Sequence, residues 1–232
     1  MTVKKMAINK LDHDTREISL SAKAVVKCDK DIATIATLDV FAKTIGNILV
    51  LTGGYAVEAL CGGKITRAHG DVDAHLILTG SKSSDEIFSG VRDLLYKEGT
   101  KWKLRDQKPD KVDYLEDDEN KEFFEKRRVE VRLNAPHEAN IKYPKKKLID
   151  SHGKVIEVCI IDLDDMVLGK IHKLFELKDG VDTTIDRDIS ISDYFDLKRL
   201  LALPELDRGD IKNKAPEEYD YVISLLQQLK FG

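Results

Sequence analysis

The sequence predicts an α/β (α+β) fold, in which a domain with a mixed β-sheet is followed by a helical C-terminal unit. Two observations lead to this prediction. Between residues 48 and 161, short apolar runs and stretches of apolar/polar alternation recur, separated by glycine and polar turns. From residue 163 onward, the apolar residues recur at helical spacing instead. We therefore expect an α/β domain over residues 1–162 and a helical domain over residues 163–232.

In the first hundred residues, the spacing of apolar residues and the turn residues between them define five elements. Residues 1–28 have the pattern of an irregular or weakly strand-like segment, and the first helix should end near Gly46. A glycine pair, Gly53-Gly54, separates a strand from a short helix, and Ser83 or Ser84 should cap the last helix. The expected elements are a helix over 31–43, a strand over 48–51, a helix over 55–60, a strand over 73–78 and a helix over 84–96.

The rest of the chain should contribute four strands and then three helices. Several strands follow one another without a long helical stretch between them, which favours a mixed sheet over a purely parallel one. The charged run over 116–128 predicts a solvated loop with a helical turn around Phe123-Phe124, and Pro204 and Pro216 should break the later helices. The expected strands cover 101–105, 112–115, 128–133 and 155–161, and the expected helices cover 164–177, 189–201 and 217–229.

Composition limits the classes of function. The 232 residues include 38 basic and 42 acidic ones, a net charge of −4, which does not indicate a general polyanion-binding surface. Three widely spaced cysteines, Cys28, Cys61 and Cys159, favour neither a disulfide framework nor a structural zinc site. No apolar run approaches the length that spans a bilayer. We therefore expect a soluble, cytoplasmic protein with no membrane partner.

Two aspartates on one predicted strand point to metal chemistry. Side chains alternate along a strand, so Asp71 and Asp73 share one face with His75. Neighbouring carboxylates repel each other unless a cation lies between them, and Mg²⁺ prefers such hard oxygen ligands. Upstream, Gly53 and Gly54 precede a short helix whose N-terminus can approach an anion. This combination predicts a divalent-metal site next to a phosphate-binding turn.

At these residues the chain resembles the nucleotidyltransferase superfamily that shares its palm with DNA polymerase beta. The motifs are Gly53-Gly54-Tyr55-Ala56 and the run from Thr66 to Asp73, which is similar to that of antibiotic nucleotidyltransferases of the aminoglycoside and lincosamide type. The resemblance is sharp over residues 50–78. It implies transfer of an NMP from an NTP, expected to be ATP, to an acceptor hydroxyl with release of pyrophosphate. It also implies two Mg²⁺ ions held by Asp71, Asp73 and a third carboxylate.

The third carboxylate is expected to be Glu130. It lies in an alternating segment that places Arg128, Glu130 and Arg132 on one strand face. The superfamily usually has Asp-apolar-His at this point, so Glu130 departs from its pattern, and Glu157 is the second choice. For Glu130, the alternative interpretation is an ion pair with Arg128 or Arg132.

Further residues are expected at the nucleotide. The resemblance and the turn chemistry assign Thr52, Gly53 and Gly54 to the triphosphate, while Arg67 and His69 either touch the nucleotide or serve as loop residues that satisfy Glu58. The C-terminal half is similar, more weakly, to bacterial toxin-type members, through Lys170 and the segments Arg187-Asp188 and Asp193 to Leu197. By this similarity Lys170 contacts a phosphate, although an ordinary solvated lysine is the competing interpretation.

Several acceptors remain open at this stage. An antibiotic hydroxyl would suit an acidic pocket formed by Asp71, Asp73, Glu130 and the run 113–125, because aminoglycosides are polycations. An RNA end would need a basic track, for which 142–147 and 121–128 are the candidates, and a protein hydroxyl is a third choice. A non-catalytic nucleotide-binding protein of the same fold is a separate alternative, although the three carboxylates favour an enzyme.

Overall fold

The centre of the computed structural model is a seven-stranded mixed sheet, and the structure describes residues 20–122, 125–134, 143–176 and 187–228. The strand order is β3-β4-β5-β2-β1-β7-β6. Two neighbouring pairs, β2 with β5 and β1 with β7, are parallel, and the other four are antiparallel. The strands are β1 (Ile48–Leu51), β2 (Val72–Ile77), β3 (Trp102–Lys108), β4 (Lys111–Glu116), β5 (Arg128–Asn134), β6 (Lys145–Ile149) and β7 (Val155–Ile160).

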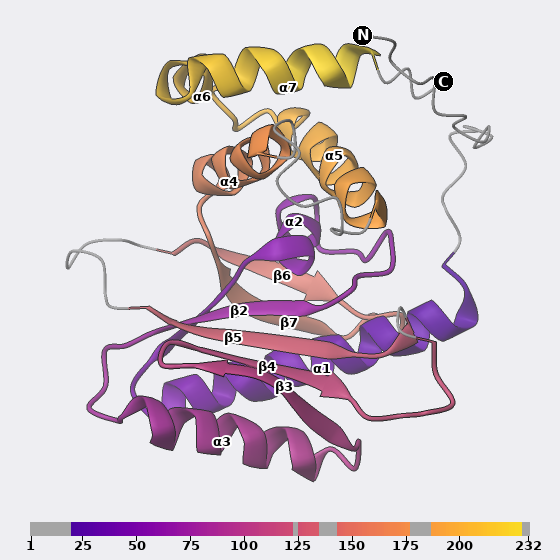
Figure 1. Cartoon of the computed structure of the whole chain (residues 1–232), viewed down its shortest axis with the longest axis vertical. Helices are drawn as coiled ribbons and strands as arrows, with labels where there is room; N and C mark the ends of the chain where they lie inside the picture. The colour runs from indigo at the N-terminus through magenta and orange to yellow at the C-terminus, as the bar shows by residue number, and fades with distance from the viewer. Residues whose placement is uncertain (1–19, 123–124, 135–142, 177–186, 229–232) are drawn as a thin grey trace, which may run out of the picture.

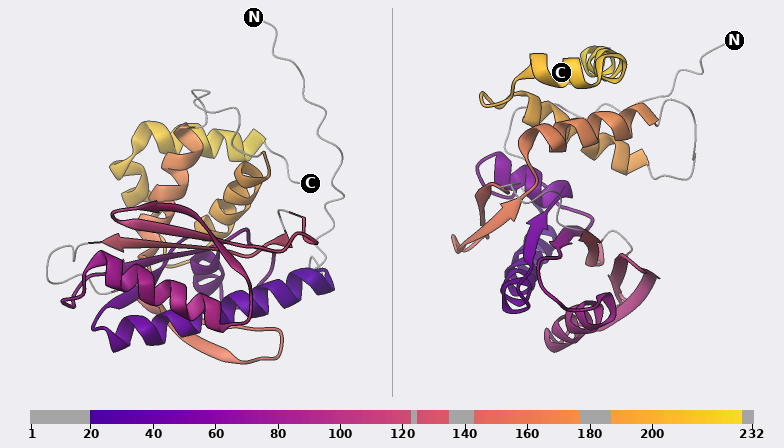
Figure 2. Two further views of the ribbon diagram at one scale, coloured as in Figure 1. Left: turned by 60° about the horizontal axis from the view of Figure 1, so that its bottom comes forward. Right: turned by 90° about the vertical axis from the view of Figure 1, so that its left-hand side faces the viewer.

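The helices form layers on both sides of this sheet (Figure 1). Helices α1 and α3 lie together on one side, whereas α2 and the C-terminal helices lie on the other, and Figure 2 shows the same separation from two further directions. The helices are α1 (Ala22–Thr44), α2 (Gly53–Leu60), α3 (Ser84–Lys97), α4 (Leu163–Glu176), α5 (Arg187–Leu201), α6 (Arg208–Lys214) and α7 (Pro216–Gln228). The predicted fold class, a mixed sheet followed by helices, is therefore confirmed.

Alternation along the strands separates the core from the polar residues that form the candidate site. On β5, Val129 and Val131 are fully buried, and Glu130 lies between them on the opposite face. On β2, Val72 and Ala74 are buried, and Asp73 lies between them. The core made by these apolar rows continues into the helices, where Ile35 and many similar residues are inaccessible to solvent. The strands thus hold their charged side chains against a rigid, apolar backing.

Local signals explain most element boundaries. Gly46 follows α1 with a φ of 74°, a conformation that glycine adopts readily, and the predicted helix end near this residue is confirmed. Ser83 caps α3 by accepting a hydrogen bond from the backbone N–H of Glu86, whose carboxylate bonds back to the cap, as in a capping box. Of the two candidate caps, Ser83 is therefore the one used.

Three predicted details are wrong. Helix α1 begins at Ala22, with Ser21 as its N-cap, whereas the sequence predicted an irregular segment to residue 28; polar residues buried in its first turns, Lys27 among them, break the apolar pattern. Strand β6 was missed because it is a lysine-rich edge strand, a composition that also suits a loop. The short α6 was missed because it is polar almost throughout. The predicted turn at Phe123-Phe124 lies outside the described residues.

Two expectations concern the chain as a whole. Among the helices that the structure describes, none combines the length and apolarity that crossing a membrane requires. The boundary between residues 162 and 163 coincides with the passage from β7 to α4, but its meaning as a domain boundary stays a prediction.

Candidate functional site

A row of carboxylates crosses four neighbouring strands. In the register of the sheet, Asp73 on β2 pairs with Glu130 on β5, Glu130 pairs with Asp113 on β4, and Asp113 pairs with Asp106 on β3. Residues paired in this way point to the same face, so the four acidic side chains form one line. Asp71 lies one alternation before Asp73, next to this row. Predicted residues Asp71, Asp73 and Glu130 are therefore brought together by the pairing of β2 with β5.

Arg128 is the cation at the centre of this row. Its guanidinium binds Asp113 through two parallel bonds of 2.9 Å, donates to Asp71 Oδ2 at 3.1 Å and donates to Glu130 Oε2 at 3.0 Å. A planar guanidinium suits such forked contacts with carboxylates. Burial would lower the pKa of Arg128, but the hydrogen bond and charge of Asp113, with Asp71 and Glu130, raise it above its usual value. Arg128 therefore stays charged and holds the acidic row together.

Glu130 is neutralised by further cations. Lys111 lies 2.8 Å from Oε2, and Arg132 donates to Oε1 at 2.7 Å, in addition to the bond from Arg128. Burial alone would raise the pKa of Glu130, but the bonds from Lys111 and Arg132 outweigh it and lower the pKa. The ion pairs weighed as the alternative for Glu130 are thus present, and a metal there would share Glu130 with these cations.

Asp73 has a different environment. Among the described residues, no hydrogen bond or ion pair to its carboxylate is found, although the charges of Arg128 and Lys170 act on it. Burial and the nearby charges of Asp71 and Glu130 raise the pKa of Asp73 to about 7. A carboxylate in this position gains most from a bound cation. Asp73 is therefore the side chain of the site best suited to ligate a metal.

The residues fit a magnesium ion that is shared with a substrate. In the described part of the chain, no three Asp, Glu, His or Cys side chains converge closely enough to hold a metal without help. Mg²⁺ sites that act on phosphates, however, commonly use one or two carboxylates and complete their octahedral shell with waters and phosphate oxygens. Asp71 and Asp73 supply two hard oxygen donors, and the raised pKa of Asp73 reflects uncompensated negative charge at this point. The donor set thus fits Mg²⁺ when phosphates supply further ligands.

The start of α2 lies directly against Asp73. Gly53 has a φ of 63°, and a Cβ atom at this residue would lie 2.2 Å from Asp73 Oδ2. The backbone of Thr52 is tied to the same strand, since its N–H donates to the carbonyl of Asp73 at 3.0 Å. The side chain of Thr52 makes no capping bond to α2. Glycine at position 53 therefore lets the helix N-terminus approach the candidate metal ligand Asp73.

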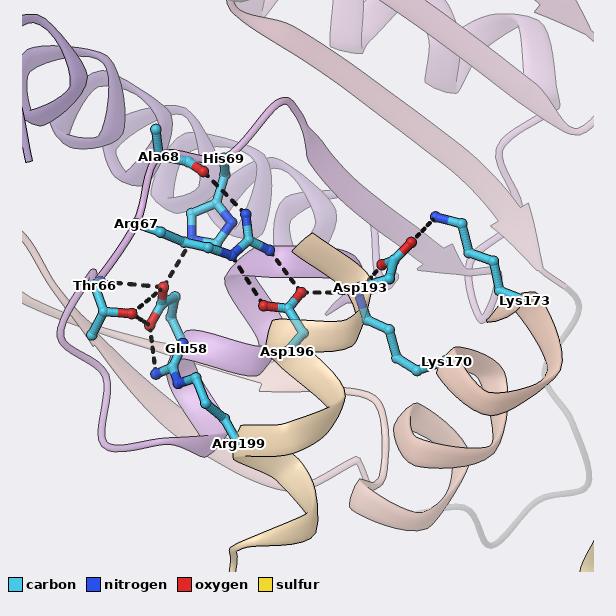
Figure 3. Close-up of polar contacts among 10 residues, drawn as sticks. All are labelled: Glu58, Thr66, Arg67, Ala68, His69, Lys170, Lys173, Asp193, Asp196 and Arg199. Atoms are coloured by element: carbon cyan, nitrogen blue, oxygen red, sulfur yellow. Dashed lines mark hydrogen bonds and ion pairs between the residues drawn. The ribbon is translucent and has the colours of Figure 1, made fainter. Parts of the chain in front are cut away.

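Gly54 admits a second pair of predicted residues, Arg67 and His69. A Cβ atom at Gly54 would lie 2.2 Å from His69 Nδ1 and 3.1 Å from Arg67 Nη2. Both side chains belong to the loop that leads into β2, and Figure 3 shows where they point. Arg67 donates to Asp196 on α5 from Nε at 3.0 Å and from Nη2 at 2.7 Å. His69 Nε2 lies 3.1 Å from Glu58 Oε1 on α2. Both residues thus bind protein carboxylates.

Glu58 is the centre of a buried polar network (Figure 3). It accepts hydrogen bonds from Thr66, contacts His69, and pairs with Arg199 at 2.9 Å. Burial would raise its pKa, but the bonds from His69 and Arg199 outweigh that effect and lower the pKa of Glu58 to about 2. Burial lowers the pKa of His69, so its ring is neutral near pH 7, and Nε2 then carries the proton toward Glu58. This network fixes the loop before β2.

Lys170 lies between two aspartates of α5. Its Nζ lies 2.5 Å from Asp193 Oδ1 and 2.9 Å from Asp196 Oδ2, and the side chain is buried (Figure 3). Asp193 also binds Lys173 at 2.6 Å. Burial would lower the pKa of Lys170, but the charges of Asp196 and Asp193 raise it. Lys170 is therefore neither solvated nor free, and it lies near enough for its charge to act on Asp73.

The structure also separates the two choices for the third carboxylate. Glu157 lies on β7, two strands from β2, and its side chain is 59% exposed beside Lys145. Glu130 lies on the strand next to Asp73 and is in register with it. The sequence grouped Asp113 with these carboxylates only as the start of the acidic run 113–125, and the register of β4 with β5 places it in the row beside Glu130. Arg199 carried no signal of its role, because its link to Glu58 crosses 141 positions of the chain.

Comparisons with known proteins give distant likenesses only. No family model and no curated protein matches the sequence. Solved structures that match include the antibiotic-resistance factor ANT(2'')-Ia, at 12% identity over 88% of this chain and 91% of that chain, with a TM-score of 0.45. JHP933 from Helicobacter pylori matches at 15% identity over 90% of this chain and 96% of that chain, with a TM-score of 0.40. A candidate nucleotidyltransferase from H. pylori matches at 15% identity over 90% of this chain and 99% of that chain, with a TM-score of 0.38. With TM-scores below 0.5 and identities of 12–15%, each of these three likenesses is distant.

Proposed function

We propose that the chain is a metal-dependent nucleotidyltransferase, which moves an NMP from an NTP to an acceptor hydroxyl and releases pyrophosphate. One observation carries this proposal. The register of β2 and β5 places Asp73 beside Glu130, with Asp71 on the same face, and Gly53 presents the start of α2 to Asp73 at close range. A carboxylate pair that ligates Mg²⁺ and a helix N-terminus that binds phosphate are therefore adjacent.

The residues of the chain divide the work of transfer as follows. Thr52, Gly53 and Gly54 bind the triphosphate, here expected to be that of ATP, through the start of α2. Asp71 and Asp73 hold the metal, and Glu130 orients the acceptor side of the site through its charge. Mg²⁺, when bound, supplies charge neutralisation to the phosphates and lowers the barrier to attack at the α-phosphorus. Most of the catalysis is positioning and charge stabilisation by preorganised groups.

Lys170 and Arg67 have different roles in the proposed site, although both bind Asp196. Neither is available to a phosphate unless that pairing is exchanged. In the bound state we expect Lys170 to turn one of its three N–H donors toward a phosphate while Asp193 keeps another. Arg67 and His69 keep their bonds to Asp196 and Glu58 and position the loop that carries Asp71. Their role is then to position the metal ligands.

The acceptor that we favour is a small molecule. The polycationic antibiotic considered above would need free acidic groups, but Asp113, Glu130 and Glu116 are each paired with a cation of the chain. An RNA acceptor would use one of the two basic tracks. In the first, Lys145 to Lys147 are the described lysines, and Lys145 pairs with Glu157. In the second, over 121–128, Lys121, Arg127 and Arg128 pair with Glu116, Asp31 and Asp113. A hydroxyl-bearing small molecule that is not a polycation therefore fits the described surface best.

The decisive experiment measures label from each α-labelled NTP, with Mg²⁺, in separated small-molecule, RNA and protein fractions. We expect wild-type protein to label the small-molecule fraction and Asp73→Asn to lose nearly all transfer, because the variant lacks a metal ligand. Asp93→Asn is the matched control, since Asp93 is an exposed aspartate of α3, on the other side of the sheet. Equal transfer by both variants would rule out the metal assignment.

A non-catalytic nucleotide-binding protein is the alternative with a distinct outcome. Such a protein would bind NTP only with Mg²⁺ and Asp73 present. It would release no pyrophosphate when small molecules, RNA or protein are added as acceptors. Release of pyrophosphate that requires Asp73 therefore separates the enzyme from the binding protein.

A further inference from the structure

A cavity of about 610 Å³ lies beside the loop that carries Asp71. That volume is within the range of small-molecule sites. Its walls come from the first turns of α1, from Ala68, and from the segment that precedes β5. Two of these walls adjoin the catalytic row directly: Lys27 donates to the carbonyls of His69 and Gly70, and Arg127 precedes Arg128. The lining of the cavity thus contains no residue of the acidic row, but the chain segments that form its walls continue into Asp71 and Arg128.

The lining of this cavity is strongly cationic. It contains one acidic residue, Glu125, and five basic ones: Lys23, Lys27, Lys30, Lys121 and Arg127. Some of these charges are balanced, because Lys23 pairs with Glu125, Lys121 with Glu116, and Arg127 with Asp31. Lys27 is 7% exposed and bonds carbonyl groups, and among described residues no carboxylate lies within ion-pair distance of Lys27 or Lys30. The charge of Lys30 therefore has no carboxylate within ion-pair distance, and that of Lys27 is offset only by carbonyl dipoles and by Asp31 at longer range.

The position of these lysines works against the stability of α1. Lys23, Lys27 and Lys30 are spaced by four and three residues, so they form one stripe along the helix. The stripe begins at the N-terminal end, where the helix dipole disfavours positive charge, and the first turn has no acidic residue. Like charges four residues apart are also unfavourable. A local conflict of this kind is typical of a functional site, and an anion in the cavity would relieve it.

The rest of the lining is apolar. Ala22, Ala24, Val26 and Ala68 contribute small hydrocarbon side chains, and Val26 is 54% exposed. The long stems of the lysines add further apolar surface. A ligand that matches both parts of the wall carries a negative group and a compact apolar body.

We propose that this cavity binds a small phosphate-bearing molecule with an apolar group. The phosphate lies at the exposed Lys23 and Lys30, next to the N-terminus of α1, and the apolar body lies against the alanines and Val26; the buried Lys27 keeps its bonds to the carbonyls of His69 and Gly70 and adds its charge to the wall. This site goes beyond the proposed transfer, because its binding requires neither Asp73 nor a metal. It lies against the loop of His69 and Gly70, so occupancy also stabilises the segment that holds Asp71.

The test is a titration of the full chain with phenyl phosphate in metal-free buffer, followed by amide chemical shifts in NMR spectra. We expect saturable shifts at the start of α1, and weaker binding of inorganic phosphate and of phenol, because each has only half of the matching chemistry. Lys23→Gln/Lys30→Gln should weaken phenyl phosphate by about tenfold or more, since each variant position loses a charge-assisted contact. Both lysines are exposed, so the variant should fold.

Two controls make the outcome specific. Lys97→Gln/Lys154→Gln removes the same charge from exposed lysines outside the cavity, and it should leave the affinity unchanged. Asp73→Asn should also bind phenyl phosphate as the wild type does, whether or not the chain transfers nucleotides. Absence of saturable binding, equal weakening by the two lysine variants, or loss of binding in Asp73→Asn would each overturn the proposal.

Discussion

At the scale of single residues, the site is defined by how each carboxylate is compensated. Glu130 and Asp113 lie on the same sheet face as Asp73 but are bound by arginine and lysine side chains. Asp73 has only the distant charges of Arg128 and Lys170 to offset Asp71 and Glu130. In its charged form, Asp73 therefore lowers the stability of the fold. In the proposed enzyme, a bound metal would offset that charge.

Asp73→Asn should stabilise the metal-free protein while it removes transfer. Burial and the charges of Asp71 and Glu130 raise the pKa of Asp73 to about 7 from an ordinary value of 3.8, so its cost to folding grows as the pH rises from about 4 and is complete above pH 7. We expect a gain of about 1–3 kcal/mol in unfolding free energy at pH 8, which shrinks as the pH falls through 7 toward 4. Denaturant unfolding at pH 8 and pH 5 in the presence of a chelator measures it. A variant less stable than wild type at pH 8 would contradict the assignment.

Glu58 should make the opposite contribution to stability. Its pKa is lowered to about 2 from 4.5, so its stabilising effect is complete above pH 4.5 and is lost as the pH falls toward 2. Glu58→Gln leaves Arg199 and His69 without their carboxylate. We expect a loss of about 2–4 kcal/mol at pH 7 and a smaller difference at pH 3, measured by denaturant unfolding. The exposed Glu119→Gln serves as the control and should change little.

At the scale of elements, glycines set how closely α2 approaches its neighbours. Gly53 and Gly54 have no side chain where Asp73, Arg67 and His69 come near the helix. The loop before β2 is then tied to α5 by the ion pair of Arg67 with Asp196. One short helix thus positions the glycine turn, the candidate metal ligand Asp73 and the C-terminal helices with respect to one another.

Gly54→Ala should therefore damage the site through packing. Its new methyl would overlap His69 Nδ1, and both His69 and Arg67 are held by buried carboxylates, so neither can move freely. We expect a loss of about 1–3 kcal/mol in unfolding free energy, together with weaker Mg²⁺-dependent NTP binding.

A matched glycine variant provides the comparison. Gly169 lies within α4, and a Cβ atom there would meet no other atom within 4 Å. Gly169→Ala should stabilise the protein by about 0.5–1 kcal/mol, because alanine lowers the entropy of the unfolded chain and favours helix. If both variants changed stability alike, the close approach at Gly54 would not be the cause.

At the scale of the whole molecule, ion pairs with buried carboxylates join α2 and the loop before β2 to helix α5. Asp196 and Arg199 of α5 bind Arg67 and Glu58, which belong to the N-terminal part of the chain. Each of these pairs crosses the predicted boundary at residues 162/163. Breaking one partner of a buried pair is costly, because the other charge remains without compensation.

Residues 1–162 should consequently not form a stable domain when they are produced alone. This fragment retains Glu58 and Arg67 but loses the partners that neutralise them, along with the apolar cover of α4 and α5 on α2. We expect no cooperative thermal transition by circular dichroism in the fragment, in contrast to the full chain. A cooperative transition near that of the full chain would show that the boundary separates independent folding units.

Much of the fold could be predicted because its signals are local. A short apolar run identified β1, strand patterns identified β2, β4, β5 and β7, and helical spacing identified α3, α4 and α5, since these patterns reflect geometry within each element. Three elements were missed or misjudged. Strand β6 and the first turns of α1 carry lysines whose burial or edge position depends on distant neighbours, and α6 is polar almost throughout. The spacing of residues within one element gives no information about such neighbours.

The sequence by itself determined which residues carry the candidate chemistry: Asp71 and Asp73 on one strand face, with a glycine turn before them. Their alternation is a property of the strand alone. The tertiary structure alone decided that Glu130 and not Glu157 lies beside Asp73, and that Arg67, His69 and Lys170 bind protein carboxylates. The physical reason is that strand order, register and ion pairs join separate elements, such as β2 to β5 and the loop before β2 to α5, and only the folded chain brings these elements together.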